Sequence, residues 1–368
     1  MKQKTAVVGL SGGVDSAVSA FLLKKKGYKV SGLFMQTFRD EQNHKNPCKS
    51  ITKMTDERMA KLIAKFLKIK FISMNTKSQY KQEVIKPMIK DYERGLTPNP
   101  DISCNKLIKF PVLLKEAKKL KADYIATGHY AQIKKTKSGY QLLQGFDKTK
   151  DQSYFLYELD QNTLAKTLFP IGTLTKKEVR KIAEKNKFPN WNKPGTRGIC
   201  FIGKTPSIKS FLEKKIKQKK GKILSPEGKV LGTHESTNYY TIGQKIQEHL
   251  GLIINKPKEF AQKRYYIADK IQKTNTIIAA PENHPMLKKK QVTIKNLHQI
   301  NPSETIPRSG LKARIRHLGQ LHKGRLIKKN NHYLFSFSKP LEALAEGQSV
   351  VIYKNNRVLG GGEIFNAL

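Results

Sequence analysis

A short apolar run that ends in a glycine-rich turn constrains the fold of this chain more than any other stretch. Residues 6–8 are typical of a buried strand in a parallel sheet, and Gly-Leu-Ser-Gly-Gly-Val-Asp-Ser follows as residues 9–16. Apolar residues recur at helical spacing from Val14 onward, so the pattern predicts a strand, a tight turn and a helix. Adjacent glycines let backbone N–H groups converge, while Ser11, Ser16 and the helix N-terminus add donors and partial positive charge. The stretch therefore predicts an anion site suited to phosphate.

The charged residue of this turn indicates which kind of phosphate site it is. A nucleotide loop that ends in Gly-Lys-Ser or Gly-Lys-Thr places its lysine on the terminal phosphates. This loop has no lysine and carries Asp15 instead, which suits a metal ion that bridges to pyrophosphate. Ser-Gly-Gly-Val-Asp-Ser resembles the PP-loop of ATP pyrophosphatases, which cleave ATP into an adenylated substrate and pyrophosphate. The alternative is an ordinary glycine-rich turn without a ligand, which the match of a complete motif after the first strand disfavours.

The chain is strongly basic, with 71 lysines and arginines against 28 acidic residues and a formal net charge of +43. A field of this sign favours a polyanionic partner, and nucleic acid is the first candidate. Only 11 of the basic residues are arginines, and lysine, asparagine and isoleucine are abundant together, as in proteins of A+T-rich genomes. Compositional drift is therefore an alternative source of the charge, and composition alone leaves both explanations open.

Neither a membrane-spanning segment nor a disulfide scaffold is expected. The apolar runs fall short of the roughly 20 residues that span a bilayer, and no secretory signal precedes the phosphate loop. The three cysteines, Cys48, Cys104 and Cys200, form no Cys-x-x-Cys pair, which disfavours a structural zinc or an iron–sulfur cluster. We therefore expect a cytoplasmic protein whose cysteines have chemical rather than structural functions.

Alternating strand and helix patterns predict an α/β fold with a doubly wound parallel sheet in the first part of the chain. Further predicted strands cover residues 28–38, 71–74 and 123–130, and predicted helices cover 57–67, 80–92 and 176–186. Such a sheet binds ligands at the carboxyl ends of its strands. The strand ends after Met35 and Thr127 are therefore expected beside the phosphate loop.

After residue 208 the pattern changes to short strands, beginning with a hairpin at residues 221–232. These strands predict a small β-rich central domain and a C-terminal β-barrel. The length of 368 residues has room for such additional domains. We expect a catalytic domain at residues 1–208, the central domain at 209–280 and the barrel at 281–368.

Two cysteines lie in segments suited to chemistry. Residues 95–105 contain two prolines and a glycine, which predicts a rigid loop before a helix from about Lys106. Cys104 would then lie near the helix N-terminus, where the dipole favours a thiolate, and Asp101 lies three residues earlier. Cys200 lies in a glycine-punctuated segment, residues 194–203. Semi-buried, inert cysteines are the alternative, which a second cysteine on the same predicted face disfavours.

Five motifs in a fixed order identify a family. They are Ser-Gly-Gly-Val-Asp-Ser, Thr-Pro-Asn-Pro-Asp-x-x-Cys-Asn-x-x-Ile-Lys-Phe, Ala-Thr-Gly-His-Tyr, Lys-Asp-Gln-Ser-Tyr-Phe-Leu and Gly-Ile-Cys-Phe-Ile-Gly. This set resembles the bacterial tRNA-specific 2-thiouridylases, PP-loop enzymes that thiolate C2 of the wobble uridine, position 34. The resemblance covers nearly the whole chain, including its β-rich C-terminal third.

The resemblance implies a role for each matching residue. ATP, with Mg²⁺, would be bound by Gly9, Leu10, Ser11, Gly12, Gly13, Val14, Asp15, Ser16, Met35 and Gly128, with Asp15 as the candidate metal ligand. Cys104 would be the nucleophile and Cys200 the persulfide carrier, the two would form a transient disulfide, and Asp101 would move a proton. The residues implied to contact tRNA are Asn99, Pro100, Asp101, His129, Lys150, Asp151, Gln152, Arg316, His317 and Gln348.

The implied partners are wobble-uridine tRNAs, by resemblance those for Lys, Glu and Gln, and a protein that donates persulfide sulfur. The chain departs from the family pattern after Met35, where Gln36-Thr37-Phe38 replaces an expected Asn-Trp. The resemblance therefore does not assign the residues that would contact the adenine ring. Cys48 lies in a divergent segment and receives no role.

Two other functions fit the phosphate loop alone. A PP-loop ligase that aminates its adenylated substrate, as GMP and argininosuccinate synthetases do, would leave two placed cysteines idle, and no glutaminase-like segment is present. An RNA-binding protein with a vestigial nucleotide site is disfavoured by the intact loop at residues 11–16. RNA-dependent consumption of ATP would separate the three functions.

Overall fold

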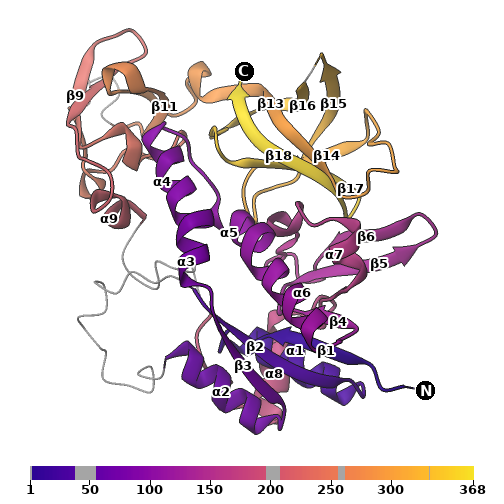
Figure 1. Ribbon diagram of the computed structural model, residues 1–368. Helices are drawn as coiled ribbons and strands as arrows, with labels where there is room; N and C mark the ends of the chain where they lie inside the picture. The colour runs from indigo at the N-terminus through magenta and orange to yellow at the C-terminus, as the bar shows by residue number, and fades with distance from the viewer. Residues whose placement is uncertain (1, 38–54, 196–207, 256–261, 331) are drawn as a thin grey trace.

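Three sheets organise the molecule, and each lies in a different part of it. The computed structural model describes residues 2–37, 55–195, 208–255, 262–330 and 332–368 (Figure 1). A five-stranded parallel sheet lies in the lower part of Figure 1, and a five-stranded mixed sheet and an eight-stranded antiparallel sheet lie above it. Among the described residues, no helix combines the length and apolarity needed to cross a bilayer.

The parallel sheet has the strand order β3-β2-β1-β4-β7, so the strand that leads into the phosphate loop lies at its centre. Its strands are β1 (Thr5–Gly9), β2 (Lys29–Gln36), β3 (Lys70–Asn75), β4 (Tyr124–Ala126) and β7 (Thr167–Leu168). The predicted doubly wound sheet is confirmed, and both β2 and β4 pair directly with β1.

Helices cover both faces of this sheet because alternate residues of β1 point into two different cores. Ala6 and Val8 belong to the core that includes residues of α1 (Val14–Lys25), α2 (Asp56–Phe66) and α8 (Lys176–Lys185). Val7 belongs to the opposite core, together with Leu113 of α6 (Phe110–Lys119). The helices expected at residues 57–67 and 176–186 are confirmed.

Two composite helices connect the sheet to the upper part of the molecule (Figure 1). The first consists of α3 (Lys77–Tyr80), the π-helical η3 (Lys81–Ile85) and α4 (Lys86–Glu93), and the second of α5 (Pro100–Ser103), the π-helical η4 (Cys104–Lys109) and α6.

The second composite helix begins earlier than the sequence predicts. The rigid-loop prediction for residues 95–105 is wrong from residue 100 onward, because the helix starts at Pro100 rather than near Lys106. The side chain of Asn99 accepts a hydrogen bond from the Ile102 N–H at 3.4 Å and caps the helix. Pro100 follows as its first residue, where a missing N–H costs nothing.

The antiparallel sheet closes into the predicted C-terminal barrel, because β13 pairs with both β16 and β18. The strands from the end of the chain are β13 (Lys288–Gln299), β14 (Leu311–Arg314), β15 (His322–Lys329), β16 (His332–Glu342), β17 (Ser349–Lys354) and β18 (Arg357–Ala367). Val292, Phe335 and Ile352 form part of its buried interior. The sequence does not predict the basic strand β15, which pairs with β14 and β16.

A hairpin from the first part of the chain extends the barrel sheet. Strands β5 (Ala131–Thr136) and β6 (Gly139–Gln144) follow β4, and β6 pairs with β18 at the far end of the chain. The sequence does not predict this hairpin, whose partner strand lies more than two hundred residues away along the chain.

The central mixed sheet is built from short strands, as expected after residue 208, and its first hairpin confirms the one predicted at residues 221–232. Its strands are β8 (Gly221–Leu224), β9 (Val230–His234), β10 (Leu252–Ile254), β11 (Tyr265–Ile271) and β12 (Thr276–Pro281). The remaining short helices are η5 (Ser153–Leu156), α7 (Gln161–Ala165), α9 (Ile208–Glu213), η6 (Thr237–Tyr239), η7 (Glu248–Leu250), η9 (Gln272–Thr274) and η10 (Pro285–Leu287).

A buried ion pair joins the segment that follows β6 to the barrel. The Asp151 carboxylate has no exposed surface and lies 2.7 Å from the Arg314 guanidinium, which is itself buried. The same carboxylate accepts hydrogen bonds from the Gly145 and Ser153 N–H groups and from the Gln144 side chain. These contacts offset part of the cost of removing two charges from water.

We expect Asp151→Asn to lower the free energy of unfolding by about 3–5 kcal/mol, because it leaves the Arg314 charge buried without a counter-ion. Urea denaturation of the intact chain measures this loss. The matched control is Glu158→Gln, which breaks the partly exposed Lys106–Glu158 pair and should cost no more than about 1 kcal/mol. Equal effects of the two substitutions would contradict a special role for the buried pair.

Candidate active site

The phosphate loop between β1 and α1 is held in shape by its own serines. Gly12 has φ +73°, and a Cβ there would lie 2.5 Å from the Asp56 carbonyl oxygen, so only glycine fits. The Ser16 hydroxyl donates to the Gly13 carbonyl at 3.0 Å and accepts from the Ser11 N–H at 3.1 Å. The Gly13 N–H donates to the Ser11 hydroxyl at 3.3 Å. The loop is therefore preorganised. A bound anion would accept hydrogen bonds from the N–H and hydroxyl groups that now bond to one another within the loop.

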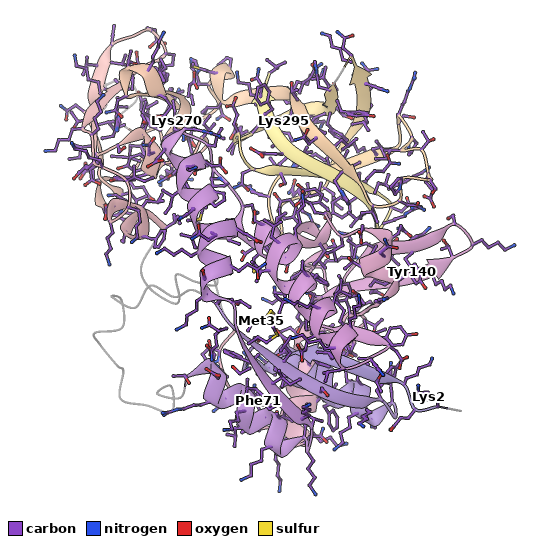
Figure 2. The ribbon with its side chains drawn as sticks, viewed as in Figure 1. Lys2, Met35, Phe71, Tyr140, Lys270 and Lys295 are labelled. Carbon is purple, nitrogen blue, oxygen red and sulfur yellow. The ribbon has the colours of Figure 1, made fainter. Side chains whose placement is uncertain are left out.

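The strand ends beside the loop lie where the sequence predicts them. Gly128 follows β4 and approaches the first turn of α1 so closely that a Cβ would lie 2.7 Å from the Ser16 nitrogen. Met35 is half-buried near the carboxyl end of β2 and lies close to the centre of the molecule (Figure 2). These two residues therefore flank the loop from the two neighbouring strands.

Two lysines from distant segments complete the loop, although the loop sequence contains none. The Lys176 ammonium lies 2.5 Å from an Asp15 carboxylate oxygen, to which the Tyr130 hydroxyl also donates at 2.9 Å. The Lys193 ammonium donates to the Gly12 carbonyl at 3.1 Å and pairs with Asp56 at 2.7 Å. The sequence alone does not indicate either lysine, because nothing in it distinguishes Lys176 and Lys193 from the many other lysines.

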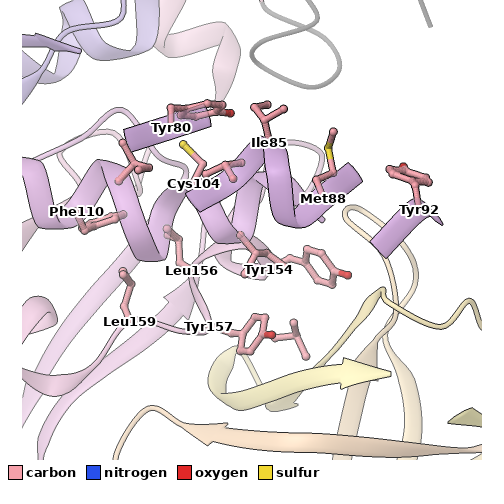
Figure 3. Close-up of a cluster of buried hydrophobic side chains, with 14 of the residues drawn as sticks. Tyr80, Ile85, Met88, Tyr92, Cys104, Phe110, Tyr154, Leu156, Tyr157 and Leu159 are labelled. Atoms are coloured by element: carbon pink, nitrogen blue, oxygen red, sulfur yellow. The ribbon is translucent and has the colours of Figure 1, made fainter. Parts of the chain in front are cut away.

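Cys104 is buried in the composite helix and faces Tyr80 (Figure 3). Burial raises the pKa of its thiol, and Asp101 raises it further, whereas Lys109 and a hydrogen bond with Tyr80 lower it. The expectation that the helix dipole favours the thiolate is wrong in its geometry, because the helix begins at Pro100 and Asp101 occupies its first turn. The positive charge that acts on the Cys104 thiol comes from Lys109 rather than from the helix terminus.

His129 lies between the loop and the Cys104 helix as a buried, neutral imidazole. Its Nδ1 lies 2.7 Å from the Thr127 hydroxyl and its Nε2 lies 3.4 Å from the Lys109 ammonium. Burial, reinforced by the Lys109 charge, holds the pKa of His129 well below its usual range. Because Gly128 touches the start of α1, adjacent residues 128 and 129 connect the phosphate loop with the helix that carries Cys104.

The residues expected to contact tRNA differ in exposure. Lys150 and Arg316 are exposed, Asn99, Asp101, Gln152, His317 and Gln348 are half-buried, and Pro100, His129 and Asp151 are buried. The side chains of Lys150 and Arg316 are therefore accessible to a phosphate group in solvent. Asp151 has no surface to offer, and its role in this structure is to hold the segment between Lys150 and Gln152 through Arg314.

His317 stacks on Phe155, with ring centroids 4.2 Å apart, beside the exposed Arg316. Burial lowers the pKa of His317 to about 4, so the imidazole is neutral near pH 7. Of these two neighbouring residues, Arg316 therefore carries the positive charge near pH 7.

The segment that leads into the Cys104 helix is held by both of the other sheets. The Lys270 ammonium of β11 donates to the Gly95 carbonyl at 2.6 Å, and burial lowers the pKa of Lys270 to about 8. The Thr97 N–H donates to the Glu346 carbonyl at 2.8 Å, and the Gln348 side chain donates to the Thr97 carbonyl at 2.9 Å. The approach to Asn99 and Asp101 is therefore built from three parts of the chain.

Cys48 and Cys200 lie outside the described residues, as does most of the glycine-punctuated segment at 194–203. The distance between Cys104 and Cys200 is therefore not part of the described geometry. Of the divergent residues 36–38, Gln36 ends β2 and donates to the Glu57 carboxylate at 3.0 Å, and Thr37 is the last described residue before the gap.

Three family models cover most of the chain in succession. A tRNA methyl transferase HUP domain matches residues 4–204, a tRNA methyl transferase PRC-barrel domain matches 209–281, and an aminomethyltransferase beta-barrel domain matches 289–364.

Relatives along the whole chain carry a more specific name. The tRNA-specific 2-thiouridylase MnmA of Coxiella burnetii (strain CbuK_Q154) is 41% identical over 99% of this chain and 96% of its own length. The enzymes of the same name from Nitrosomonas eutropha and Buchnera aphidicola are 38% and 42% identical, each over 100% of this chain and 100% and 98% of their own lengths. With such identity from end to end, this chain belongs to the tRNA-specific 2-thiouridylase family.

Proposed function

We propose that this protein replaces the C2 oxygen of the wobble uridine, position 34, of tRNA with sulfur at the expense of ATP. One observation carries the proposal beyond family membership: the phosphate loop and Cys104 lie on either side of residues 128 and 129. Gly128 contacts the loop at Ser16 and His129 contacts the Cys104 helix at Lys109. An activating site and a thiol thus meet at one edge of the sheet.

The loop is suited to the activation step. Uridine oxygen is a poor leaving group, and adenylation turns it into the oxygen of AMP, with pyrophosphate released. The loop amides and α1 would hold the phosphates, and Lys176 and Lys193 would add positive charge where it develops on the leaving pyrophosphate.

Asp15 is the residue suited to a Mg²⁺ ion. Its carboxylate already attracts the Lys176 ammonium, which marks a position where a cation is favourable. No group of three or more potential ligands lies together among the described residues, so such an ion would take its other ligands from the nucleotide and water. The ion would neutralise charge on the phosphates when bound.

Sulfur would arrive as a persulfide on Cys200. The terminal sulfur forms a bond to C2 and AMP leaves with the oxygen. The Cys104 thiolate then attacks the Cys200 Sγ, the S–S bond breaks, and its electron pair stays on the sulfur bonded to C2, which gives 2-thiouridine after uptake of a proton. A Cys104–Cys200 disulfide remains, which a cellular thiol reductant must open, and Asp101 is placed to move the proton.

The other parts of the chain would bind the tRNA. We propose residues 1–208 as the catalytic domain and 209–280 and 281–368 as domains that contact tRNA, with transcripts for Lys, Glu and Gln as substrates and a cytoplasmic persulfide protein as sulfur donor. The wobble base lies in a single-stranded loop, so turning it into the site costs less than extraction from a duplex.

Asp15→Ala should slow tRNA-dependent pyrophosphate release by about a hundredfold or more, because the mutant loses the carboxylate at the phosphate loop. The fold should persist, since Asp15 is half-buried and faces Tyr130 and Lys176 rather than the core. Glu93→Gln, an exposed change in α4, is the control. Release by Asp15→Ala at the rate of the unmodified protein would remove the ATP site from this loop.

The cysteines should separate by function. Cys200→Ser should accept no persulfide and form no thiouridine, whereas Cys104→Ser should be loaded at Cys200 yet fail in transfer or turnover. Cys48→Ser should behave as the unmodified protein. Mass spectrometry of the protein and of tRNA nucleosides measures both steps, and turnover without reductant should yield a Cys104–Cys200 cross-linked peptide. Full thiolation by Cys104→Ser or Cys200→Ser would exclude the relay.

Binding of tRNA should weaken steeply with salt, with a log–log slope beyond about −3, if several phosphates are neutralised. Lys150→Gln and Arg316→Gln should each reduce the slope by about 1. Lys25→Gln and Lys26→Gln, at the end of α1 away from the loop, are exposed controls. The intact chain is the right material, because β6 pairs with β18. A salt-independent affinity would contradict phosphate binding.

A further inference from the structure

One π-helical turn contains both Cys104 and a lysine, Lys109. In η4 the backbone bonds skip one residue more than in an α-helix, and the Phe110 N–H donates to the Asn105 carbonyl. Cys104 and Lys109 are the first and last residues of this wider turn. Lys109 therefore lies about one turn beyond Cys104 on the same side of the helix. Such π-helical turns are common at functional sites.

Two side chains, Asn105 and His129, orient the ammonium of Lys109. Asn105 donates its amide to the Phe155 carbonyl at 3.0 Å, which leaves its Oδ1 to accept from Lys109 at 2.8 Å. An ammonium has no lone pair, so the His129 Nε2 is the acceptor of the 3.4 Å contact. The His129 proton is then on Nδ1, where it donates to the Thr127 hydroxyl at 2.7 Å.

This arrangement leaves Lys109 one donor for chemistry. An ammonium carries three N–H groups, and two have acceptors among the described residues. The His129 imidazole is neutral and buried, so it orients the ammonium without supplying a charge that would neutralise it. A cation held in one orientation in partly buried surroundings interacts more strongly with a nearby anion than the same cation does in water.

The groups around the Cys104 thiol explain why a cation is required. Burial and the Asp101 carboxylate of α5 raise the pKa of the thiol, whereas Lys109 of η4 and a hydrogen bond with Tyr80 of α3 lower it. Of the described groups that act on this thiol, Lys109 is the one positive charge. Burial dominates, so the thiol is protonated by default and the cation must act against that effect.

We propose that Lys109 is a positioning residue that stabilises the Cys104 thiolate when the thiolate attacks the Cys200 Sγ. The role rests on the proposed sulfur transfer, in which Cys104 supplies the electron pair that forms the new disulfide bond. Lys109 contributes no atom to the product. Its charge offsets part of the cost of deprotonating the attacking sulfur in a site that also contains the Asp101 carboxylate.

Thiol titration tests this role without tRNA or ATP. In a protein with Cys48→Ser and Cys200→Ser, Cys104 is the sole thiol, and its ionisation is followed by thiolate absorbance after subtraction of the matching Cys104→Ser protein. Lys109→Met should raise the titration midpoint of the Cys104 thiol by about one pH unit or more. Lys109→Arg, which keeps the charge, should bring the midpoint most of the way back to its original value. Lys106→Met, in the same η4 but exposed and paired with Glu158, should leave the midpoint unchanged.

A midpoint that does not move in Lys109→Met would overturn the proposal and leave the proposed thiolation untouched. If Lys109→Met does not fold, Lys109→Gln retains a donor for Asn105, lacks the charge, and should show the same shift. In the otherwise unmodified protein, the pH profile of single-turnover thiouridine formation should move to higher pH in Lys109→Met and return in Lys109→Arg. A loss of rate at every pH that arginine does not restore would indicate a structural role instead.

Discussion

The buried pair of Asp151 and Arg314 is the contact on which the active site depends most. Asp151 fixes the backbone at Ser153 and Gly145, and the segment that follows supplies the Phe155 carbonyl that orients Asn105. Gln152, its neighbour, accepts from the Tyr130 N–H, and the Tyr130 hydroxyl reaches Asp15 in the phosphate loop. One fully desolvated carboxylate thus supports both the nucleotide site and the thiol site, and it ties them to the barrel through Arg314.

Positive charge at the two sites comes from single, directed lysines rather than from the excess of +43 as a whole. Lys176 and Lys193 reach the loop from the α8 region, while Lys109 lies in the same π-helical turn as Cys104. Most other described lysines are exposed and screened by salt, so they add to the overall positive field of the chain rather than to either site. The basic composition and the basic site are therefore separate properties of the same chain.

Local patterns predicted the elements whose residues have a clear periodicity or clear turn signals. The strand at β1, the helices α1, α2 and α8, and the β8–β9 hairpin follow from periodicity and turn residues, so their existence was predictable. The β5–β6 hairpin and β15 were not, because short strands of mixed polarity form only against a partner strand. The helix start at Pro100 was missed because the prolines suggested a loop, whereas Asn99 and Pro100 form a cap.

The sequence by itself determined the phosphate loop, the order of the motifs and hence the family, because these depend on residue types at fixed local spacing. Only the tertiary structure decided which polar residues act together. It buried Asp151, which the motif suggested as an RNA contact, and brought Lys176 to Asp15. It also placed Lys109 between Asn105 and His129. The physical reason is that desolvation and hydrogen-bond geometry depend on neighbours from distant segments, which no local pattern in a lysine-rich chain can distinguish.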